Sequence, residues 1–550
     1  MLSQPPFFSF GVLPLLWSKA IRRPLLRCIR RCRLGLILTD ERKPAMSERQ
    51  RRTRLNILTS LLNQAVTMVC GLIIPRLMLT SFGSEAYGAT TSIAQFLSYI
   101  TLLEGGVCGV ARAALYKPLV ERDSRAISGV VADIRRFFRA IAYVFVVYTL
   151  LLAASYKSIS RIQCLDWLSS AALVVVISLS IFTEYFIGIS YDALLQADQK
   201  TYVTQTITVM SVVLNAVMMF VLIRLGCGLI LVKLASGIVF SLKPFLLWLY
   251  VRRHYRLEPV PAGQGHALQQ KWDALAQHLA YFLHCNIDVF VLTLLSNLTQ
   301  VAVYGVHTMV ISKVERLASA SSAGMEAMFG EQYARGDRQA LNRIFGQYET
   351  LISAVSLFIF GVCAVMLVPF VRLYTAHISD ADYIAPVFAL LMVLGSLLTM
   401  LRSPCHSMVI AAGHFRQTRW AAFGEAIINV TLSVILVWKL GLVGVAIGTV
   451  AAVLFRFVYY MVYLSRHIIH RPARLFVRRC VYCAAVFAAI VAAGTAVCAW
   501  LGAASPLHWV LTAIAVSVVA GAVLVAGLVL FYREDSLALF GMLRRRFSRR

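Results

Sequence analysis

Long apolar segments recur along almost the whole chain, and they restrict its fold more than any other feature. A membrane-spanning helix needs about 20 consecutive apolar residues, and fourteen such segments follow residue 55. They are 56–80, 89–115, 137–155, 168–190, 203–223, 227–250, 274–297, 301–330, 348–371, 383–411, 418–438, 442–464, 477–501 and 507–532. Only 14% of the residues are charged, whereas a soluble domain has about 25%. The pattern predicts an all-helical, polytopic membrane protein.

The basic residues gather in alternate loops. If the N-terminus lies inside, 27 Lys and Arg residues fall in the inside loops and the C-terminal tail, against 5 in the outside loops. The positive-inside rule therefore predicts that both termini are cytoplasmic. This distribution also explains the net charge of +28, so we expect no nucleic-acid partner.

The first 45 residues differ from the rest. The segment "KAIRRPLLRCIRRCRL" (19–34) is strongly basic, and a second possible start lies at Met46, just before the first span. Two interpretations are open: the arm binds an anionic membrane surface, or it is upstream sequence before the native start, which we favour. Cys28 and Cys32 lack a second pair of ligands, so we expect no zinc site.

Three pairs of segments repeat in the same order. Residues 83–93 resemble 299–310, 118–127 resemble 332–341, and 223–240 resemble 438–455, at offsets of 217, 214 and 215 residues. A nearly constant offset indicates duplication of a six-helix unit. The predicted division is 46–250 for an N-terminal lobe, 251–273 for a cytoplasmic linker, 274–464 for a C-terminal lobe and 465–550 for two extra helices and a basic tail. Parallel repeats of this kind place a substrate site between the lobes.

Charged residues inside the spans are candidates for this site, because each costs about 2.5–3.5 kcal/mol at the centre of a membrane. Lys313 and Arg316 are the strongest candidates: they lie deep within the predicted span 301–330 and share one helix face. They form either a cationic cavity wall or part of a buried ion network. The other candidates for substrate binding are Arg76, Arg112, Lys233, Arg402 and Arg456. Arg76, Arg112 and the further intramembrane base Lys243 are close enough to span ends to reach the interface instead.

Six acids also fall within the interiors of the spans: Glu104, Glu184, Asp288, Glu315, Glu326 and Glu425. They either pair with the bases or bind H⁺ or Na⁺ to couple transport to an ion gradient. Asp288 is the first candidate for ion coupling, followed by Glu104 and Glu315.

The first two spans resemble those of bacterial polysaccharide and O-antigen flippases (Wzx-like). The resemblance lies in an Asn- and Gln-containing first helix, "PRL" at 75–77, "FGSEAYG" at 82–88 and Glu104-Gly105, and it extends over roughly residues 50–465. These motifs are shared across the wider superfamily of MATE-like exporters. The resemblance implies two six-helix lobes around a cavity, and alternating access for lipid-linked oligosaccharides in the bacterial inner membrane. Lys313 and Arg316 would then receive the anionic diphosphate of a polyprenyl-linked glycan.

Two other functions compete with a flippase. A MATE-type ion-coupled exporter of small molecules shares the fold, but it typically takes cationic substrates, whereas the interiors of the spans contain eight bases and six acids. A membrane glycan polymerase or ligase would resemble a protein with a long catalytic outside loop, and the outside loops here are short. We expect neither enzymatic activity nor a cofactor or metal.

Overall fold

The computed structural model describes residues 48–104, 107–258, 286–322, 325–335, 337–503 and 505–531. The predicted arm 1–45 and most of the predicted linker lie outside this range, as does the tail beyond residue 531. The chain divides into two compact units, Met1–Leu55 and Asn56–Arg550. All contacts discussed below are within the second unit.

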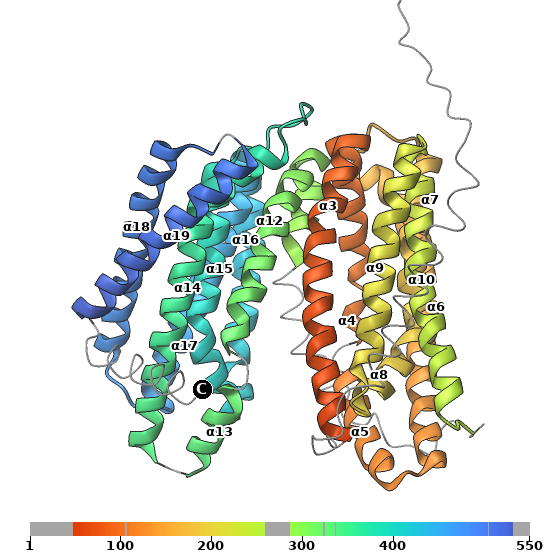
Figure 1. The fold of residues 1–550 in the computed structure, drawn as a ribbon, viewed down its shortest axis with the longest axis horizontal. Helices are drawn as coiled ribbons and strands as arrows, with labels where there is room; N and C mark the ends of the chain where they lie inside the picture. Colours follow the sequence, from red (N-terminus) through yellow and green to blue (C-terminus); the bar gives the residue numbers. More distant parts are fainter. Residues whose placement is uncertain are drawn as a thin grey trace, which may run out of the picture. The chain divides into compact units, whose positions relative to one another are not determined.

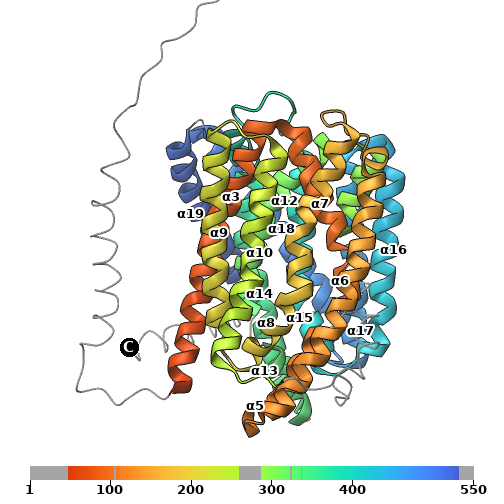
Figure 2. The ribbon, with the colours of Figure 1, turned by 90° about the vertical axis from the view of Figure 1, so that its right-hand side faces the viewer.

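The described residues form helices connected by short loops, with no strand among them (Figures 1 and 2). The N-terminal half contains α3 (Glu48–Ser98), α4 (Thr101–Glu104), α5 (Val107–Glu121), α6 (Ser124–Ser160), α7 (Trp167–Thr183), the π-helix η1 (Glu184–Gly188), α8 (Ile189–Ala197), α9 (Thr201–Arg224) and α10 (Leu229–His254). The C-terminal half contains a short apolar helix (Asn286–Leu295), α12 (Leu298–Ser319), the 3₁₀ turn η2 (Ala320–Ser322), α13 (Met325–Arg335), α14 (Arg338–Tyr374), α15 (Pro386–Ala411), α16 (Phe415–Leu440), α17 (Leu442–His467), α18 (Ala473–Leu501) and α19 (Pro506–Phe531). Within the described residues, 11 helices are long and apolar enough to cross a membrane.

Helix α3 contains the first predicted span and the beginning of the second, because the chain turns sharply at Gly83. This residue has φ 81° and ψ 172°, a conformation that residues with a Cβ atom rarely adopt. A Cβ atom at this position would also lie 2.9 Å from Asp380 Oδ2. The second span therefore begins at Ser84, a few residues before the predicted boundary.

Two predicted spans differ from the structure in a way that matters for the site. The span 89–115 is interrupted, since α3 ends at Ser98 and α4 begins at Thr101. The span 301–330 is too long, because α12 ends at Ser319 and α13 is a separate helix. The small polar residues after Ala318 favour turns over a continued helix. Arg316 consequently lies in the last turn of α12 rather than deep within a span, and Glu326 belongs to α13.

Two aspartates of the sequence repeat have the same structural role. Asp123 caps the N-terminus of α6 and accepts hydrogen bonds from the backbone N–H groups of Arg125 and Ala126. Asp337 caps α14 and accepts from Ala340 N–H. Each capped helix is 37 residues long. These matching features agree with a duplication, although the boundaries of the two lobes stay a prediction.

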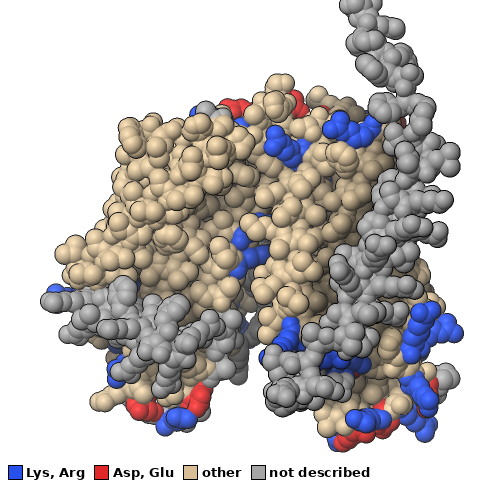
Figure 3. Space-filling model, viewed as in Figure 1, with Lys and Arg blue, Asp and Glu red and all other residues tan. Residues whose placement is uncertain are grey.

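The two halves pack as separate helical bundles that touch toward the end carrying Gly83. The largest buried apolar cluster of the N-terminal half draws its residues from positions 78 to 251. Between the halves, Ser92 Oγ lies 2.9 Å from Thr293 Oγ1, and the rings of Phe96 and Phe290 are 5.2 Å apart. Figure 3 shows a cleft between the halves that opens at the lower end of the view and contains Lys or Arg side chains.

Candidate functional site

Lys313 extends from α12 toward the N-terminal half. Asn297 caps the start of α12 by accepting a hydrogen bond of 2.8 Å from Gln300 N–H, and Lys313 follows about 22 Å along the helix axis. Its Nζ lies only 3.3 Å from where a Cβ atom of Gly71 would stand on α3. The glycine thus leaves room for an ammonium group between the two halves, as expected for a residue of a shared cavity.

The positive charge of Lys313 and Arg316 has no counter-ion among the described residues. Neither side chain forms an ion pair with a described carboxylate, and Arg316 is exposed. Glu315, next to Arg316 in sequence, instead lies close to the Ser396 hydroxyl on α15. The predicted ion-coupling residue Glu315 therefore faces the interior of the C-terminal bundle, and the cationic pair on the other face of α12 is not neutralised by it.

Arg76 is the second candidate that the structure places where the halves meet. Its guanidinium carbon lies 5.9 Å from the ring centre of Tyr374 on α14. The Tyr374 hydroxyl in turn donates a hydrogen bond of 2.6 Å to the carbonyl of Leu72 on α3. Arg76 follows Gly71 by about 7.5 Å along its helix, so the same stretch of α3 meets both Lys313 and α14.

Arg402 and Arg456 have a different environment from Lys313. Both guanidinium groups bind the carboxylate of Glu425, which is fully buried at 0% exposure, and their own side chains are 11% and 12% exposed. Arg456 also donates a 2.9 Å hydrogen bond to the hydroxyl of Tyr460. This geometry matches the buried ion network that the sequence left open as an alternative to a cavity wall.

The remaining basic candidates lie in the N-terminal half. Arg112 Nη1 donates a hydrogen bond of 2.8 Å to Gln196 Oε1. Lys233 is partly buried in α10 and forms no ion pair with a described carboxylate. The side chain of Glu104, at the end of α4, falls outside the described part of the structure.

Asp288 lies in a buried polar cluster that also contains Tyr304, Asn429 and Thr449, here called the Asp288 cluster. Its Oδ2 atom accepts hydrogen bonds from the Tyr304 hydroxyl at 3.1 Å and the Thr449 hydroxyl at 3.2 Å. Thr449 Oγ1 is also 3.3 Å from Asn429 Oδ1. The other carboxylate oxygen, Oδ1, is buried without a hydrogen-bond partner among the described residues. A buried carboxylate with one unsatisfied oxygen, next to the oxygens of neighbouring hydroxyl groups, is a suitable environment for a proton or a small hard cation.

A glycine brings the helices of this cluster together. A Cβ atom on Gly448 of α17 would lie 2.8 Å from Ser433 N and 3.2 Å from Asn429 O on α16. The close approach places Asn429 and Thr449 on facing turns. Sequence reasoning missed both residues, because Thr449 is 161 positions from Asp288 and a lone Asn or Thr in an apolar helix carries no distinguishing signal.

Solved structures with the same arrangement of helices are transport proteins. The lipid II flippase MurJ in an inward closed conformation matches with a TM-score of 0.66 and 14% identity, over 87% of this chain and 99% of that one. An inward-facing multidrug resistance MATE family transporter of the MOP superfamily matches with a TM-score of 0.52 and 15% identity, over 72% of this chain and 94% of that one. The MATE multidrug transporter DinF-BH matches with a TM-score of 0.54 and 16% identity, over 78% of this chain and 98% of that one. No protein-family model and no curated protein sequence matches the chain.

The chain has the MATE-like transporter fold. This confirms the predicted all-helical fold of a polytopic membrane protein. At 14 to 16% identity the similarity extends to the fold alone.

Proposed function

We propose that this protein is a flippase, which carries lipid-linked oligosaccharide or polysaccharide precursors across the bacterial inner membrane by alternating access. The anionic diphosphate and the sugars would pass through the cleft between the two halves, while the polyprenyl tail stays in the bilayer. The Gly83 end would face outward, and both termini would be cytoplasmic, in line with the distribution of basic residues.

The observation that carries this proposal is the cationic pair Lys313 and Arg316, which has no counter-ion among the described residues. A charge pair about 4 Å apart near a protein surface contributes about 4 kcal/mol, which exceeds the cost of about 2.5–3.5 kcal/mol for a single cation such as Lys313 at membrane depth. A diphosphate carries more than one negative charge, so it can compensate two cations and a third from Arg76. These basic residues would therefore be the contacts for the head group.

The Asp288 cluster would couple transport to an ion gradient. A carboxylate with one orphaned oxygen and three neighbouring hydroxyl or amide oxygens would bind H⁺ or Na⁺ as a co-substrate. Binding neutralises a buried charge, so it would bias the packing of α16 and α17 against the helix Asn286–Leu295.

A MATE-type exporter of small molecules is the alternative with the same fold. Such exporters typically take cationic substrates, which Lys313 and Arg316 would repel. The two functions make opposite predictions for cells that depend on this protein, because an exporter variant would alter sensitivity to toxic cations and leave the surface glycan unchanged.

The test uses cells that lack the native gene product and express the full chain. We expect Lys313→Ala/Arg316→Ala to lower surface glycan at least about tenfold, the change that a loss of about 1.4 kcal/mol produces. Lipid-linked precursor should accumulate inside. Surface glycan is measured with the amount of membrane-inserted protein held equal.

Lys157→Ala/Arg161→Ala is the matched control, since it removes the same charge from the far end of α6 and should leave export normal. Normal surface glycan in the Lys313→Ala/Arg316→Ala variant would contradict the proposal.

A further inference from the structure

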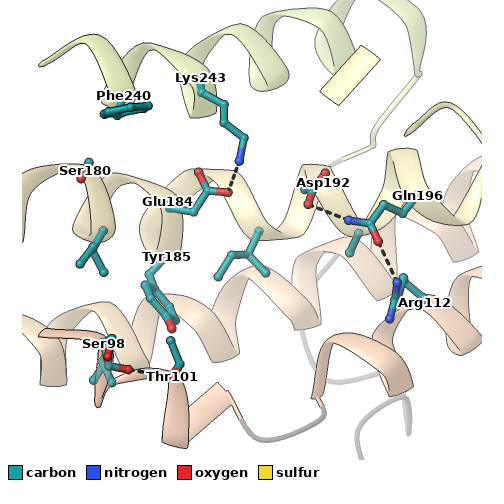
Figure 4. A pocket seen from close by; sticks show the side chains of 14 residues that line it. Ser98, Thr101, Arg112, Ser180, Glu184, Tyr185, Asp192, Gln196, Phe240 and Lys243 are labelled. Atoms are coloured by element: carbon teal, nitrogen blue, oxygen red, sulfur yellow. Dashed lines mark hydrogen bonds and ion pairs between the residues drawn. The ribbon is translucent and has the colours of Figure 1, made fainter. Parts of the chain in front are cut away.

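The N-terminal bundle contains a polar pocket that the proposed diphosphate contacts do not use. Its volume is about 670 Å³, and its wall includes Thr101, Glu184, Ala193 and Lys243, contributed by α4, η1, α8 and α10 (Figure 4). Pockets of about 300–1,000 Å³ hold small organic ligands, and a bare ion needs far less room. Polar side chains at membrane depth are costly and usually functional. We name this cavity the N-terminal pocket.

The charges of the N-terminal pocket neutralise one another. Lys243 Nζ donates to Glu184 Oε1 at 3.1 Å. Arg112 donates to Gln196, whose amide donates to Asp192 Oδ2 at 2.8 Å, as Figure 4 shows. The described charged residues of the wall are thus two bases and two acids. A ligand of this pocket needs no net charge, in contrast to a ligand of Lys313 and Arg316.

The backbone around the pocket is adapted to hold these side chains. A Cβ atom at position 188 would lie 2.9 Å from Glu184 Cδ, so only glycine lets the Glu184 carboxyl group fold back over η1. Such π-helical turns are frequent at functional sites. On the opposite wall, the interruption between Ser98 and Thr101 lines the same pocket. Two helices that depart from regular geometry at one cavity indicate a binding site more strongly than either alone.

The wall combines hydroxyl and amide groups with apolar surface. The hydroxyl groups of Thr101 and Ser180 lie at the end of the pocket that also carries the aromatic rings of Tyr185 and Phe240. The amide of Gln196 lies at the other end, beside Asp192 and Arg112. Sugar rings present the same two kinds of surface, with hydroxyl groups along their edges and C–H groups on their faces. A small cation or a phosphate would use only part of this wall.

We infer that the N-terminal pocket binds the neutral sugar residues of the lipid-linked glycan. This inference rests on the proposed function and divides the work between two sites. The cations of α12 and α3 hold the diphosphate, and the N-terminal pocket holds the sugars attached to it. Substrates would then be selected by the sugars in the N-terminal pocket.

Two probes separate these roles on the purified full-length protein in detergent. One is the oligosaccharide released from the cell's own lipid-linked precursor by mild acid, which leaves no phosphate on the sugar. The other is a polyprenyl diphosphate without sugar. Calorimetry should show that Ala193→Phe, which fills the pocket, weakens oligosaccharide binding at least tenfold and changes polyprenyl diphosphate binding less than twofold. Lys313→Ala/Arg316→Ala should do the reverse.

A second variant with a smaller change in side-chain volume keeps the test valid if Ala193→Phe misfolds. Thr101→Val removes one hydroxyl of the pocket and should weaken oligosaccharide binding several-fold. Thr206→Val is its matched control: both hydroxyls donate to a backbone carbonyl a few residues earlier in the chain, at 2.8 Å and 2.7 Å, but Thr206 is exposed on α9. Melting temperatures establish whether each variant is folded. If Ala193→Phe is not folded, the binding of oligosaccharide to Thr101→Val tests the inference.

Unchanged oligosaccharide binding in the folded pocket variants would overturn the inference. So would a wild-type protein that binds polyprenyl diphosphate but no oligosaccharide at millimolar concentration, although the proposed function would survive that result. Failure of the wild-type protein to bind either probe would instead refute the proposed function, and this inference with it.

Discussion

A buried charge in this protein has a role that depends on its partner. Arg402 and Arg456 share the fully buried carboxylate of Glu425, so their charge is largely used within the fold. Lys313 faces Gly71 and has no described carboxylate partner, so its charge is available to a ligand. A basic residue within the helices is therefore structural in one case and a candidate for substrate binding in the other.

This difference predicts opposite outcomes for stability. Glu425→Ala leaves two guanidinium groups buried without their shared carboxylate, and breaking such a network costs about 3–5 kcal/mol. We expect a large fall in melting temperature in detergent, whereas Lys313→Ala should cause little change. Glu331→Ala is a suitable control, because its pair with Arg335 is 59% and 63% exposed and contributes about 0–1 kcal/mol. A Glu425→Ala variant as stable as the control would show that this network does not hold the bundle together.

At this scale the sequence identified the charged residues but not their pairing. Glu425 lies 23 and 31 positions from its two arginines, and helix packing alone decides which side chains meet. Asp288 is buried as its apolar surroundings in the sequence suggest, and its role in ion coupling stays a prediction. Its partners Asn429 and Thr449 follow only from the packing of α16 against α17.

Hydrogen bonds between α3 and the loop before α15 connect the two halves at the Gly83 turn. Ser84 N–H donates a hydrogen bond of 2.6 Å to Asp380 Oδ2, and Ser84 Oγ donates one of 2.7 Å to Asp380 Oδ1. The Tyr383 hydroxyl lies 2.6 Å from Ser84 Oγ. Burial raises the pKa of Tyr383 above its ordinary value, so this hydroxyl stays protonated and donates to Ser84. The Asp380 carboxylate also lies at the start of the helical segment that begins at Ser84, where the helix dipole favours a negative charge.

We expect these bonds to hold the Gly83 end closed. Hydrogen bonds to a charged group contribute about 1.5–3 kcal/mol, so Asp380→Ala should raise the population open at this end about tenfold. The reporter is Ser92→Cys, which is buried between the halves. It is labelled in intact cells with a membrane-impermeant thiol reagent after Cys164, Cys227 and Cys498 are replaced by Ser.

Asp382→Ala is the control for this experiment, because Asp382 bonds within its own loop, to Ile384 N–H at 2.8 Å. Ser84→Ala should act in the same direction as Asp380→Ala, and the double variant should not exceed the larger single effect. Equal labelling of the Asp380→Ala and Asp382→Ala variants would rule out this closure.

The sequence predicted the elements well where apolar length decides them. The long helices α6, α9, α10 and α14 to α19 each contain most or all of a predicted span, and Asp123 and Asp337 begin helices as their capping chemistry suggests. The departures arise where a few residues interrupt an apolar run, at Gly83, after Ser98 and after Ser319. Apolar length averages over such local turns, so it merged or extended the spans there.

Within its described residues, the molecule combines a cleft between two bundles, a cationic pair on α12 without a carboxylate partner, the buried Asp288 cluster in the C-terminal half and the N-terminal pocket. In the proposed function, the cationic pair binds a charged head group, the Asp288 cluster responds to an ion and the N-terminal pocket selects sugars. Alternating access requires that the contacts at the Gly83 end break while the opposite end closes. In the proposed function, the cationic pair binds the diphosphate of the glycan substrate while the protein changes between its inward-open and outward-open states.

The most direct measurement is transport by the purified protein in vesicles. A polyprenyl diphosphate oligosaccharide with a fluorescent label on its sugar is placed in both leaflets, and a membrane-impermeant reductant bleaches only the outer one. We predict that the wild-type protein delivers the protected label to the outer leaflet, and that Lys313→Ala/Arg316→Ala is at least about tenfold slower while Asp382→Ala matches the wild type. A wild-type rate no faster than that of protein-free vesicles, or a normal rate in the Lys313→Ala/Arg316→Ala variant, would contradict the proposed function.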